Sequence, residues 1–192
     1  AENRSQNHYN FKLGVDWNPT PNQTITIFGL YDYEWHIDTT RVWYFGNKDY
    51  NYPLRKWGFY ESEGTGFTNL TLQHKYRFPQ SGHELNSQLL FTKGWEDETY
   101  NLKQDGPLPF PLINTDKTRV LAPEYIYLFS SDYVRPLAFG RLEAGISGRL
   151  RHMPITYTVT KDPANTALIY NFGDWSKWNE SLVGAYLNLV AE

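Results

Sequence analysis

The segment YRFPQSGHELNSQLLF, residues 76–91, places a chain reversal between two runs in which apolar and polar residues alternate. The first run stops at Pro79-Gln80-Ser81-Gly82, and the second begins directly after it. Proline fixes φ near the value that a turn requires and glycine permits positive φ, so the segment predicts a tight β-hairpin. The alternation continues for about twenty residues in some arms, for example over 83–103 and 117–135.

Two further tight turns are expected on the same grounds, at 18–22 (Asn-Pro-Thr-Pro-Asn) and at 136–140 (Pro-Leu-Ala-Phe-Gly). Between the turns lie longer polar stretches, which we interpret as loops, at 39–60, 103–117 and 160–175. The second of these contains three prolines between 107 and 111, which cannot pair in the interior of a sheet. The chain is therefore expected to form hairpins with every tight turn at one end and every long loop at the other.

The arms between these turns have a period of two, which is the strand period. In the first arm Phe11, Leu13, Val15 and Trp17 share one face, and Asn10, Lys12, Gly14 and Asp16 share the other. Similar patterns occupy 24–35, 67–78, 141–151 and 180–190. No segment has a competing helical period, so we predict an all-β fold of about seven antiparallel, up-and-down strands.

Two all-β architectures fit such alternation: a soluble β-sandwich and a transmembrane β-barrel. Strands of sandwiches seldom exceed about ten residues, whereas the longest arms here are about twice that length. A tilted membrane strand needs about 9–11 residues, and the surplus would project outside the membrane. Short turns on one side and long loops on the other are typical of outer-membrane barrels, in which the short turns are periplasmic.

Aromatic residues agree with a barrel. Trp17, Phe78 and Tyr133 precede the three tight turns, and Trp35 and Trp95 lie ten residues beyond Ile25 and Leu85 on the same faces. Ten residues of tilted strand cover the apolar band of about 25 Å, so these rings would mark its two interfaces. The simpler alternative is that aromatic residues favour strands in general. Four apolar residues fall on the polar face instead: Phe28, Leu30, Leu90 and Leu128. Either a β-bulge shifts the register of the strand, or these residues pack against something that fills the barrel.

The composition of the chain limits the remaining classes of protein and of function. The 192-residue chain has a net charge of −3, which gives no reason to expect a nucleic-acid partner, and it has no cysteine for disulfides or thiolate chemistry. No apolar run reaches the length of about 18 residues that a membrane helix needs. The first residue is not Met and no signal peptide precedes the pattern, as expected of a mature product or an excised piece.

Three segments resemble a known family. GHELNSQLLFTKGWEDETY (82–100) resembles the strand that follows a periplasmic turn in Bacteroidetes-type outer-membrane β-barrel proteins of the TonB-dependent receptor superfamily. IYLFSSDYVRPL (126–137) with GRLEAGISGRL (140–150) is similar to the turn D-Y-x-x-P-L and the following G-x-L-E-A-G of that family. WNESLVGAYLNL (178–189) is similar to its E-x-x-x-A-A-Y-L-N strand. The order and spacing of the three also agree, over roughly residues 9–192.

The resemblance implies a barrel of roughly 22 strands closed by a plug domain. It also implies uptake of a bulky nutrient, a metal chelate or a glycan, with energy passed through TonB. The lipid bilayer with lipopolysaccharide and a surface lipoprotein are the further partners implied. The expected domain organisation is a single barrel segment, 1–192, without a plug. Because an open sheet edge is not tolerated in lipid, we expect seven strands to belong to a longer protein or to be completed by other chains.

Motifs for chemistry are scarce, and we expect neither an enzyme nor a cofactor. The five histidines, His8, His36, His74, His83 and His152, lack the close spacing of a zinc motif, so no metal site is predicted. The acidic run Glu96-Asp97-Glu98 is interpreted as a solvated edge, with calcium as the alternative. Asp32 and Glu34 share a strand face about 7 Å apart, which does not by itself form a catalytic cleft.

The aromatic loops are the candidate binding site. Eight aromatic residues lie in 42–60 and four in 170–178. Exposed rings would suit stacking on sugars or planar chelates, while the alternative is that they pack on each other. The residues proposed to bind ligand, in extracellular loops, are Trp43, Tyr44, Tyr50, Tyr52, Trp57, Trp175 and Trp178. In a soluble carbohydrate-binding or adhesive sandwich, the alternative function, the same rings would form the ligand platform.

Overall fold

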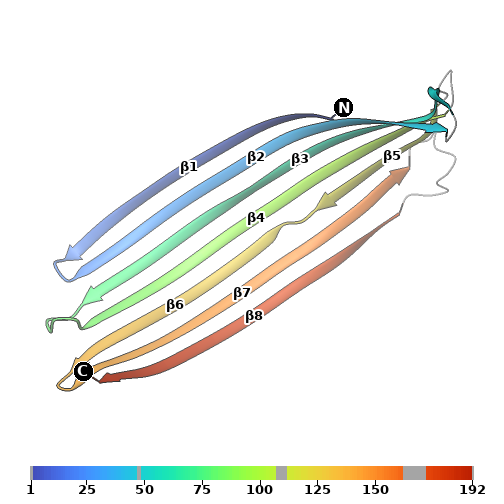
Figure 1. The fold of residues 1–192 in the computed structure, drawn as a ribbon. Coiled ribbons are helices and arrows are strands. Elements are labelled where there is room, and N and C mark those ends of the chain that lie inside the picture. The colour runs from blue at the N-terminus through green and yellow to red at the C-terminus, as the bar shows by residue number, and fades with distance from the viewer. Residues whose placement is uncertain (1, 47–48, 107–111, 162–171, 192) are drawn as a thin grey trace.

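The computed structural model describes residues 2–46, 49–106, 112–161 and 172–191. They form one antiparallel sheet, in which each hairpin arm lies beside the next (Figure 1). The sheet contains eight strands: β1 (Glu2–Thr20), β2 (Gln23–Gly46), β3 (Asp49–Arg77), β4 (Glu84–Asp105), β5 (Leu112–Leu121), β6 (Glu124–Leu137), β7 (Gly140–Lys161) and β8 (Phe172–Ala191). No helix of the described residues is long and apolar enough to cross a membrane.

The three tight turns are confirmed, and they lie together at one end of the sheet (Figure 1). They connect β1 to β2, β3 to β4, and β6 to β7. Gly82 and Gly140 have φ values of 74° and 143°, which L side chains rarely adopt. At Gly140 a Cβ atom would also lie 1.9 Å from the carbonyl oxygen of Val190 on β8, so the third turn requires glycine.

The number of strands differs from the expected seven because one arm is interrupted. β5 and β6 both pair with β4 on one side and β7 on the other. Leu121 lies opposite Asp97 and Glu124 opposite Gly94, so the two halves keep one register along β4. Pro123, which has no N–H to donate, interrupts the ladder between them. The eight strands thus form seven rows across the sheet.

The expectation of long loops was wrong for the described residues of 39–60, 103–117 and 160–175, apart from Gly106. Residues 47–48, 107–111 and 162–171 lie outside the described part of the chain. β2 and β3 stay paired as far as Tyr44 and Arg55, and the irregular register lies beyond that point. β4 continues to Asp105, and β8 begins at Phe172. Alternating aromatic and polar side chains suit strands, and this local preference extends the arms outward.

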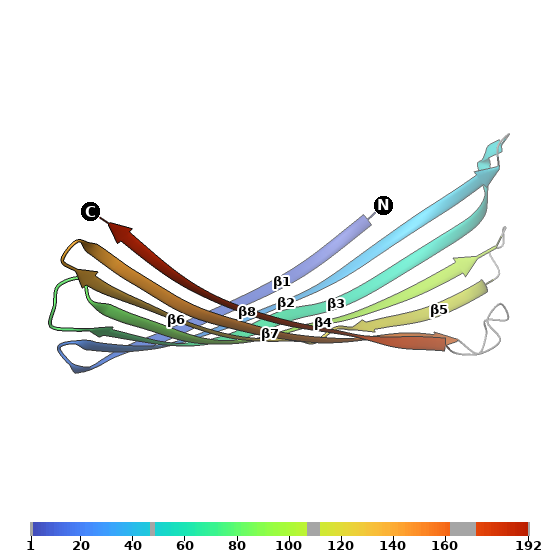
Figure 2. The same ribbon diagram turned by 90° about the horizontal axis from the view of Figure 1, so that it is seen from below.

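The two faces of the sheet differ in chemistry. The outer face carries Leu13, Ile27, Leu70, Leu89 and Phe129 in successive strands, and the inner face carries Asp16, Thr26, Gln73, Gln88 and Ser130. Ile27, Leu70 and Leu89 are 51–59% exposed, whereas the inner-face residues Phe28, Thr71 and Leu90 of the same strands are half-buried. Figure 2 shows that the sheet is curved, and the difference in exposure is that expected of a barrel wall curving toward its inner face.

The four apolar residues that broke the pattern lie on the inner face without a bulge. Phe28 pairs with Thr71, Thr71 with Leu90, and Leu90 with Leu128, in a register that shows no shift at these positions. Leu30 lies beside this row, opposite Asn69. The bulge explanation was therefore wrong, and the residues form an apolar row across a polar face.

The sandwich alternative does not fit the structure. A sandwich buries its apolar faces between two sheets, but the described residues form one sheet, with Val159 as their one buried apolar side chain. Within the described part of the chain, β1 pairs with β2 alone and β8 with β7 alone. Both outermost strands thus keep one unpaired edge, and β1 presents side chains from Tyr9 to Trp17 that are about 60% exposed.

Aromatic rings gather at both ends of the apolar outer face. At the turn end, the rings of Phe78 and Tyr133 meet edge to face with centroids 6.1 Å apart. At the other end, Trp95 stacks on Tyr33 at 5.6 Å, and Trp35 Nε1 donates to Ser62 Oγ at 3.2 Å. Beyond Trp95 the outer face becomes charged, beginning with Asp97 and Arg119. The rings therefore mark the two limits of the apolar band, as predicted.

Candidate functional site

The inner face beyond the Trp35 and Trp95 rows carries two neighbouring groups of side chains. One is an aromatic cluster, Tyr44, Trp57 and Phe59, and the other is an acidic cluster around His36. Strand alternation positions both, because Trp57, Phe59, Glu61 and Glu63 are alternate residues of β3 and so share its inner face. Together they occupy the part of the β2–β3 hairpin that extends past the apolar band.

Five of the seven predicted ligand-binding residues lie in this hairpin, but in strands rather than in a loop. Trp43 and Tyr44 belong to β2, and Tyr50, Tyr52 and Trp57 belong to β3. The placement in extracellular loops was therefore wrong for these residues. The side chains of Tyr50 and Tyr52 lie outside the described part of the structure.

Tyr44 and Trp57 come together on the inner face. Their ring centroids are 4.9 Å apart, and Trp57 meets Phe59 edge to face at 6.0 Å. Within the described part of the chain, the Trp57 Nε1–H is buried without a hydrogen-bond partner. Trp43, the adjacent residue of β2, points to the outer face, where Lys56 Nζ lies 5.7 Å from its ring centroid. The predicted set is thus divided between the two faces.

Trp175 and Trp178 are not joined to this cluster. Both belong to β8, where they lie opposite Thr156 and Met153 of β7, and they are 72% and 55% exposed. β4, the β5–β6 row and β7 separate them from the β2–β3 hairpin. Because they are three positions apart along one strand, they also point to opposite faces. Their expected position in a loop was wrong as well.

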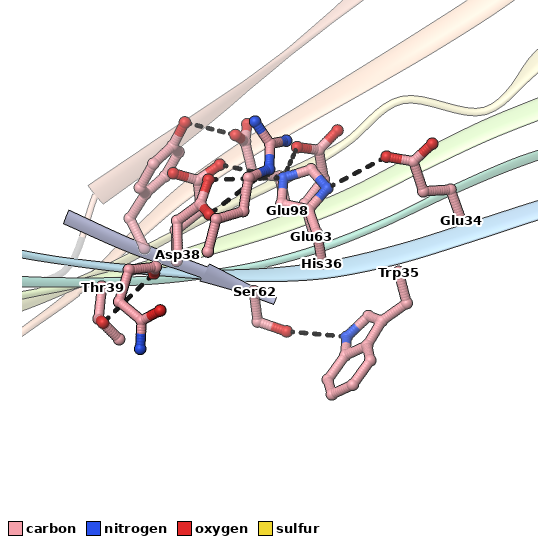
Figure 3. Close-up of polar contacts among 12 residues, drawn as sticks. Glu34, Trp35, His36, Asp38, Thr39, Ser62, Glu63 and Glu98 are labelled. Carbon is pink, nitrogen blue, oxygen red and sulfur yellow. Dashed lines mark hydrogen bonds and ion pairs between the residues drawn. The ribbon is translucent and has the colours of Figure 1, made fainter. Parts of the chain in front are cut away.

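The acidic cluster surrounds the imidazole of His36, which is 5% exposed. Its Nε2 lies 2.8 Å from Glu63 Oε2 and 3.7 Å from Glu61 Oε1, and its Nδ1 lies 3.6 Å from Glu34 Oε1. Figure 3 shows the carboxylates of Glu34 and Glu63 turned toward the ring while Trp35 points to the opposite side of the sheet. Asp38, on the same face, lies 4.0 Å from Nε2.

Burial, together with the crowding of carboxylates, changes the proton affinity of Glu61 and Glu63. Burial, followed by a hydrogen bond with Glu98, raises the pKa of Glu61 above its ordinary value. Burial also raises the pKa of Glu63, although the nearby His36 opposes this. Tyr100 donates its hydroxyl hydrogen bond to Glu98, which raises the pKa of the phenol. The cluster is therefore a site where negative charge is in excess.

Sequence reasoning missed this cluster for a definite reason. A histidine motif is visible only within a single segment, whereas His36 meets Glu61 and Glu63 across a strand pair. The acidic run at 96–98 was a partial signal. Alternation divides it, so that Glu98 faces the His36 cluster from β4, while Asp97 points outward to Arg119.

The candidate carboxylate pair Asp32 and Glu34 is also divided between partners. Asp32 accepts hydrogen bonds from Asn10 and His8, at 2.8 and 2.9 Å, whereas Glu34 faces His36. The two side chains therefore support different parts of the inner face and do not form one cleft.

Comparison of the chain with known protein families agrees with the antiparallel sheet described above. The model of the outer membrane protein beta-barrel family matches residues 76–192, from the end of β3 through β8. That range covers more than half of the chain and includes two of the three tight turns. No curated protein matches the chain. The match also assigns the protein to the outer membrane.

Proposed function

Because the chain belongs to the outer membrane protein β-barrel family, we propose that it forms part of the wall of a receptor that imports a bulky nutrient. The nutrient is a metal chelate or a glycan, and energy for uptake comes from TonB through a plug domain elsewhere in the receptor. The resemblance of 82–100, 126–150 and 178–189 to TonB-dependent receptors supports this proposal. The wall would be completed to roughly 22 strands, which leave a lumen wide enough for a plug.

The observation that carries the proposal is the aromatic cluster Tyr44, Trp57 and Phe59 on the inner face. Ring faces of this kind stack on the apolar faces of sugars and on planar chelates. The buried Nε1–H of Trp57 has no hydrogen-bond partner in the residues that the structure describes, and a ligand oxygen would satisfy it. The cluster lies beyond the apolar band on the side away from the tight turns, which in outer-membrane barrels is the extracellular side.

The same arrangement suggests the partners. The outer face would contact lipid, with lipopolysaccharide around its charged outer end, and a surface lipoprotein would cover the extracellular strand ends. The proposal includes no catalytic step and no nucleic-acid partner. The apolar row from Phe28 to Leu128 would pack against the plug, because without such a partner these side chains would be exposed to water in the lumen.

Binding and uptake by the complete receptor test this proposal. Radiolabelled glycans and metal chelates are offered to cells, and uptake is compared before and after the proton gradient that drives TonB is dissipated. The variant Trp57→Ala should weaken binding of the imported ligand roughly 3- to 10-fold, as expected for the loss of one stacking interaction. Trp43→Ala is the matched control, since its ring points to the outer face of the neighbouring strand.

Two results would contradict the proposal. Uptake that continues undiminished without the proton gradient would indicate a passive pore. Equal effects of Trp57→Ala and Trp43→Ala would remove the aromatic cluster from the ligand site.

A further inference from the structure

We propose that His36, Glu61 and Glu63 bind a divalent transition-metal ion on the inner face, just outside the apolar band. This site is separate from the aromatic cluster, and it does not depend on which nutrient the receptor imports. Imidazole nitrogen together with carboxylate oxygen is a donor set that zinc and its neighbours in the first transition row accept.

The geometry already approximates a metal site. One donor atom from each of the three residues lies within 4.8 Å of the others. His36 Nε2 faces both carboxylates, at 2.8 Å from Glu63 Oε2 and 3.7 Å from Glu61 Oε1. Ligands of a tetrahedral zinc ion, each about 2.0–2.2 Å from the metal, are roughly 3.3–3.5 Å apart. Small side-chain rotations would therefore admit the ion.

Strand pairing holds the three residues in place. His36 of β2 lies directly opposite Glu63 of β3, and Asp38 lies opposite Glu61. Directly opposed residues of an antiparallel pair have Cβ atoms about 4.5–5.5 Å apart, close enough for their side chains to share a ligand. The site is thus built on two paired strands and does not require a loop to order.

The state of His36 is a second, independent observation. The ring is 5% exposed, and its Nδ1 is buried without a hydrogen-bond partner among the described residues. A buried unsatisfied ring nitrogen is costly. Metal bound at Nε2 would leave the proton on Nδ1, pointing toward Glu34 Oε1 at 3.6 Å. A small movement would complete the carboxylate–histidine–metal arrangement that supports ligating histidines in many sites.

The balance of charge also favours a cation. Five carboxylates lie in the cluster: Glu34, Asp38, Glu61, Glu63 and Glu98. Arg4 of β1 brings one positive charge to its margin, 3.6 Å from Asp38. Calcium would also meet this charge, but calcium takes six to eight oxygen ligands, and a central imidazole selects against it. We therefore assign the site to a transition metal.

Titration of the metal-free, detergent-solubilised complete receptor tests the assignment. Isothermal titration with Zn²⁺ should show one equivalent bound, and Co²⁺ should give the visible absorption of a low-symmetry site with a nitrogen ligand. His36→Gln should weaken Zn²⁺ binding at least 100-fold, and Glu63→Gln at least 10-fold. Glu34→Gln should weaken it about 10-fold, as for other partners of a ligating histidine.

His8→Gln is the matched control and should leave Zn²⁺ binding unchanged. His8 also lies on the inner face, but it meets one carboxylate, Asp32, at 2.9 Å. Absence of stoichiometric Zn²⁺ binding by the wild-type receptor would overturn the proposal, as would equal binding by His36→Gln. Tighter binding of Ca²⁺ than of Zn²⁺, insensitive to His36→Gln, would assign the cluster to a hard cation and would overturn it as well. The Co²⁺ spectrum needs no variant, so a folding defect in one variant does not leave the question open.

Discussion

The indole of Trp95 lies over Gly66 of the adjacent strand β3. A Cβ atom at Gly66 would come within 3.2 Å of two ring carbons and within 2.7 Å of the carbonyl oxygen of Asp32. The same ring stacks on Tyr33 of β2, at a centroid distance of 5.6 Å. Glycine at position 66 therefore makes room for the aromatic ring that closes the apolar band.

Gly66→Ala should destabilise the protein by about 1–3 kcal/mol, because the ring and the backbone of β2 must both move. Urea unfolding in lipid vesicles measures the change. Gly58→Ala is the matched control in the same strand, since a Cβ there meets nothing within 4 Å. If both variants have the same stability, Trp95 does not rest on Gly66 in the folded protein.

The two faces of β3 predict opposite tolerance to charge. Leu70→Arg places a guanidinium on the outer face near the middle of the apolar band and should cost about 2–4 kcal/mol. Thr71→Arg places the same group at nearly the same depth on the inner face and should have a much smaller effect. Unfolding free energies of the two variants in vesicles provide the comparison. A larger cost for Thr71→Arg would reverse the assignment of the faces.

The turn between β3 and β4 predicts a specific role for His83. Its ring stacks on Phe78 with centroids 3.8 Å apart, and its Nε2 lies 2.9 Å from the hydroxyl of Tyr133 on β6. His83→Ala removes both interactions and should destabilise the protein by about 1–2 kcal/mol. Tyr133→Phe removes the hydrogen bond alone and should cost less. Denaturant midpoints separate these outcomes, and an unchanged midpoint for His83→Ala would show that the turn does not depend on the ring.

The pair formed by Asp97 and Arg119 predicts a pH-dependent contribution outside the apolar band. Two hydrogen bonds from the guanidinium, at 2.7 and 2.6 Å, lower the pKa of Asp97 below its ordinary value of 3.8. A depressed carboxyl pKa stabilises the folded state above the unfolded pKa, and this stability is lost as pH falls through the folded value. Because both side chains are partly exposed, the coupling at pH 7 should be about 0.2–1 kcal/mol.

A double-mutant cycle with Asp97→Asn and Arg119→Gln measures this coupling. It should be present at pH 7 and should decline only below about pH 4. Coupling that declines between pH 7 and pH 5 would point to another titrating group.

Much of the fold could be predicted because its signals are local. Pro79 with Gly82, and Pro136 with Gly140, define turns through backbone geometry alone, and the alternation from Phe11 to Trp17 assigns one face. The outer ends of the strands were harder to predict. A polar, aromatic-rich segment such as 42–60 is compatible with a loop or a strand. The cross-strand pairing of Val42 with Trp57 makes it a strand.

The candidate site depended on contacts that a linear pattern does not contain. His36 and Glu63 are far apart in sequence, and only the register of β2 with β3 brings them to 2.8 Å. The aromatic residues were recognised, but their division between faces was not. Trp43 and Tyr44 are neighbours in sequence and point in opposite directions, because successive strand residues alternate.

The most direct test of the central claim is the accessibility of single cysteines along β3 and β4 in the outer membrane. Residues 1–192 contain no native cysteine, so within this segment each introduced one can be labelled specifically with a nitroxide. Labels at Leu70, Leu72 and Leu89 should collide with oxygen dissolved in lipid, while labels at Thr71, Gln73 and Gln88 should collide with a water-soluble nickel complex. This alternation is the result that a barrel wall with a lipid-facing outer face predicts. Equal access of the nickel complex to both sets would contradict it.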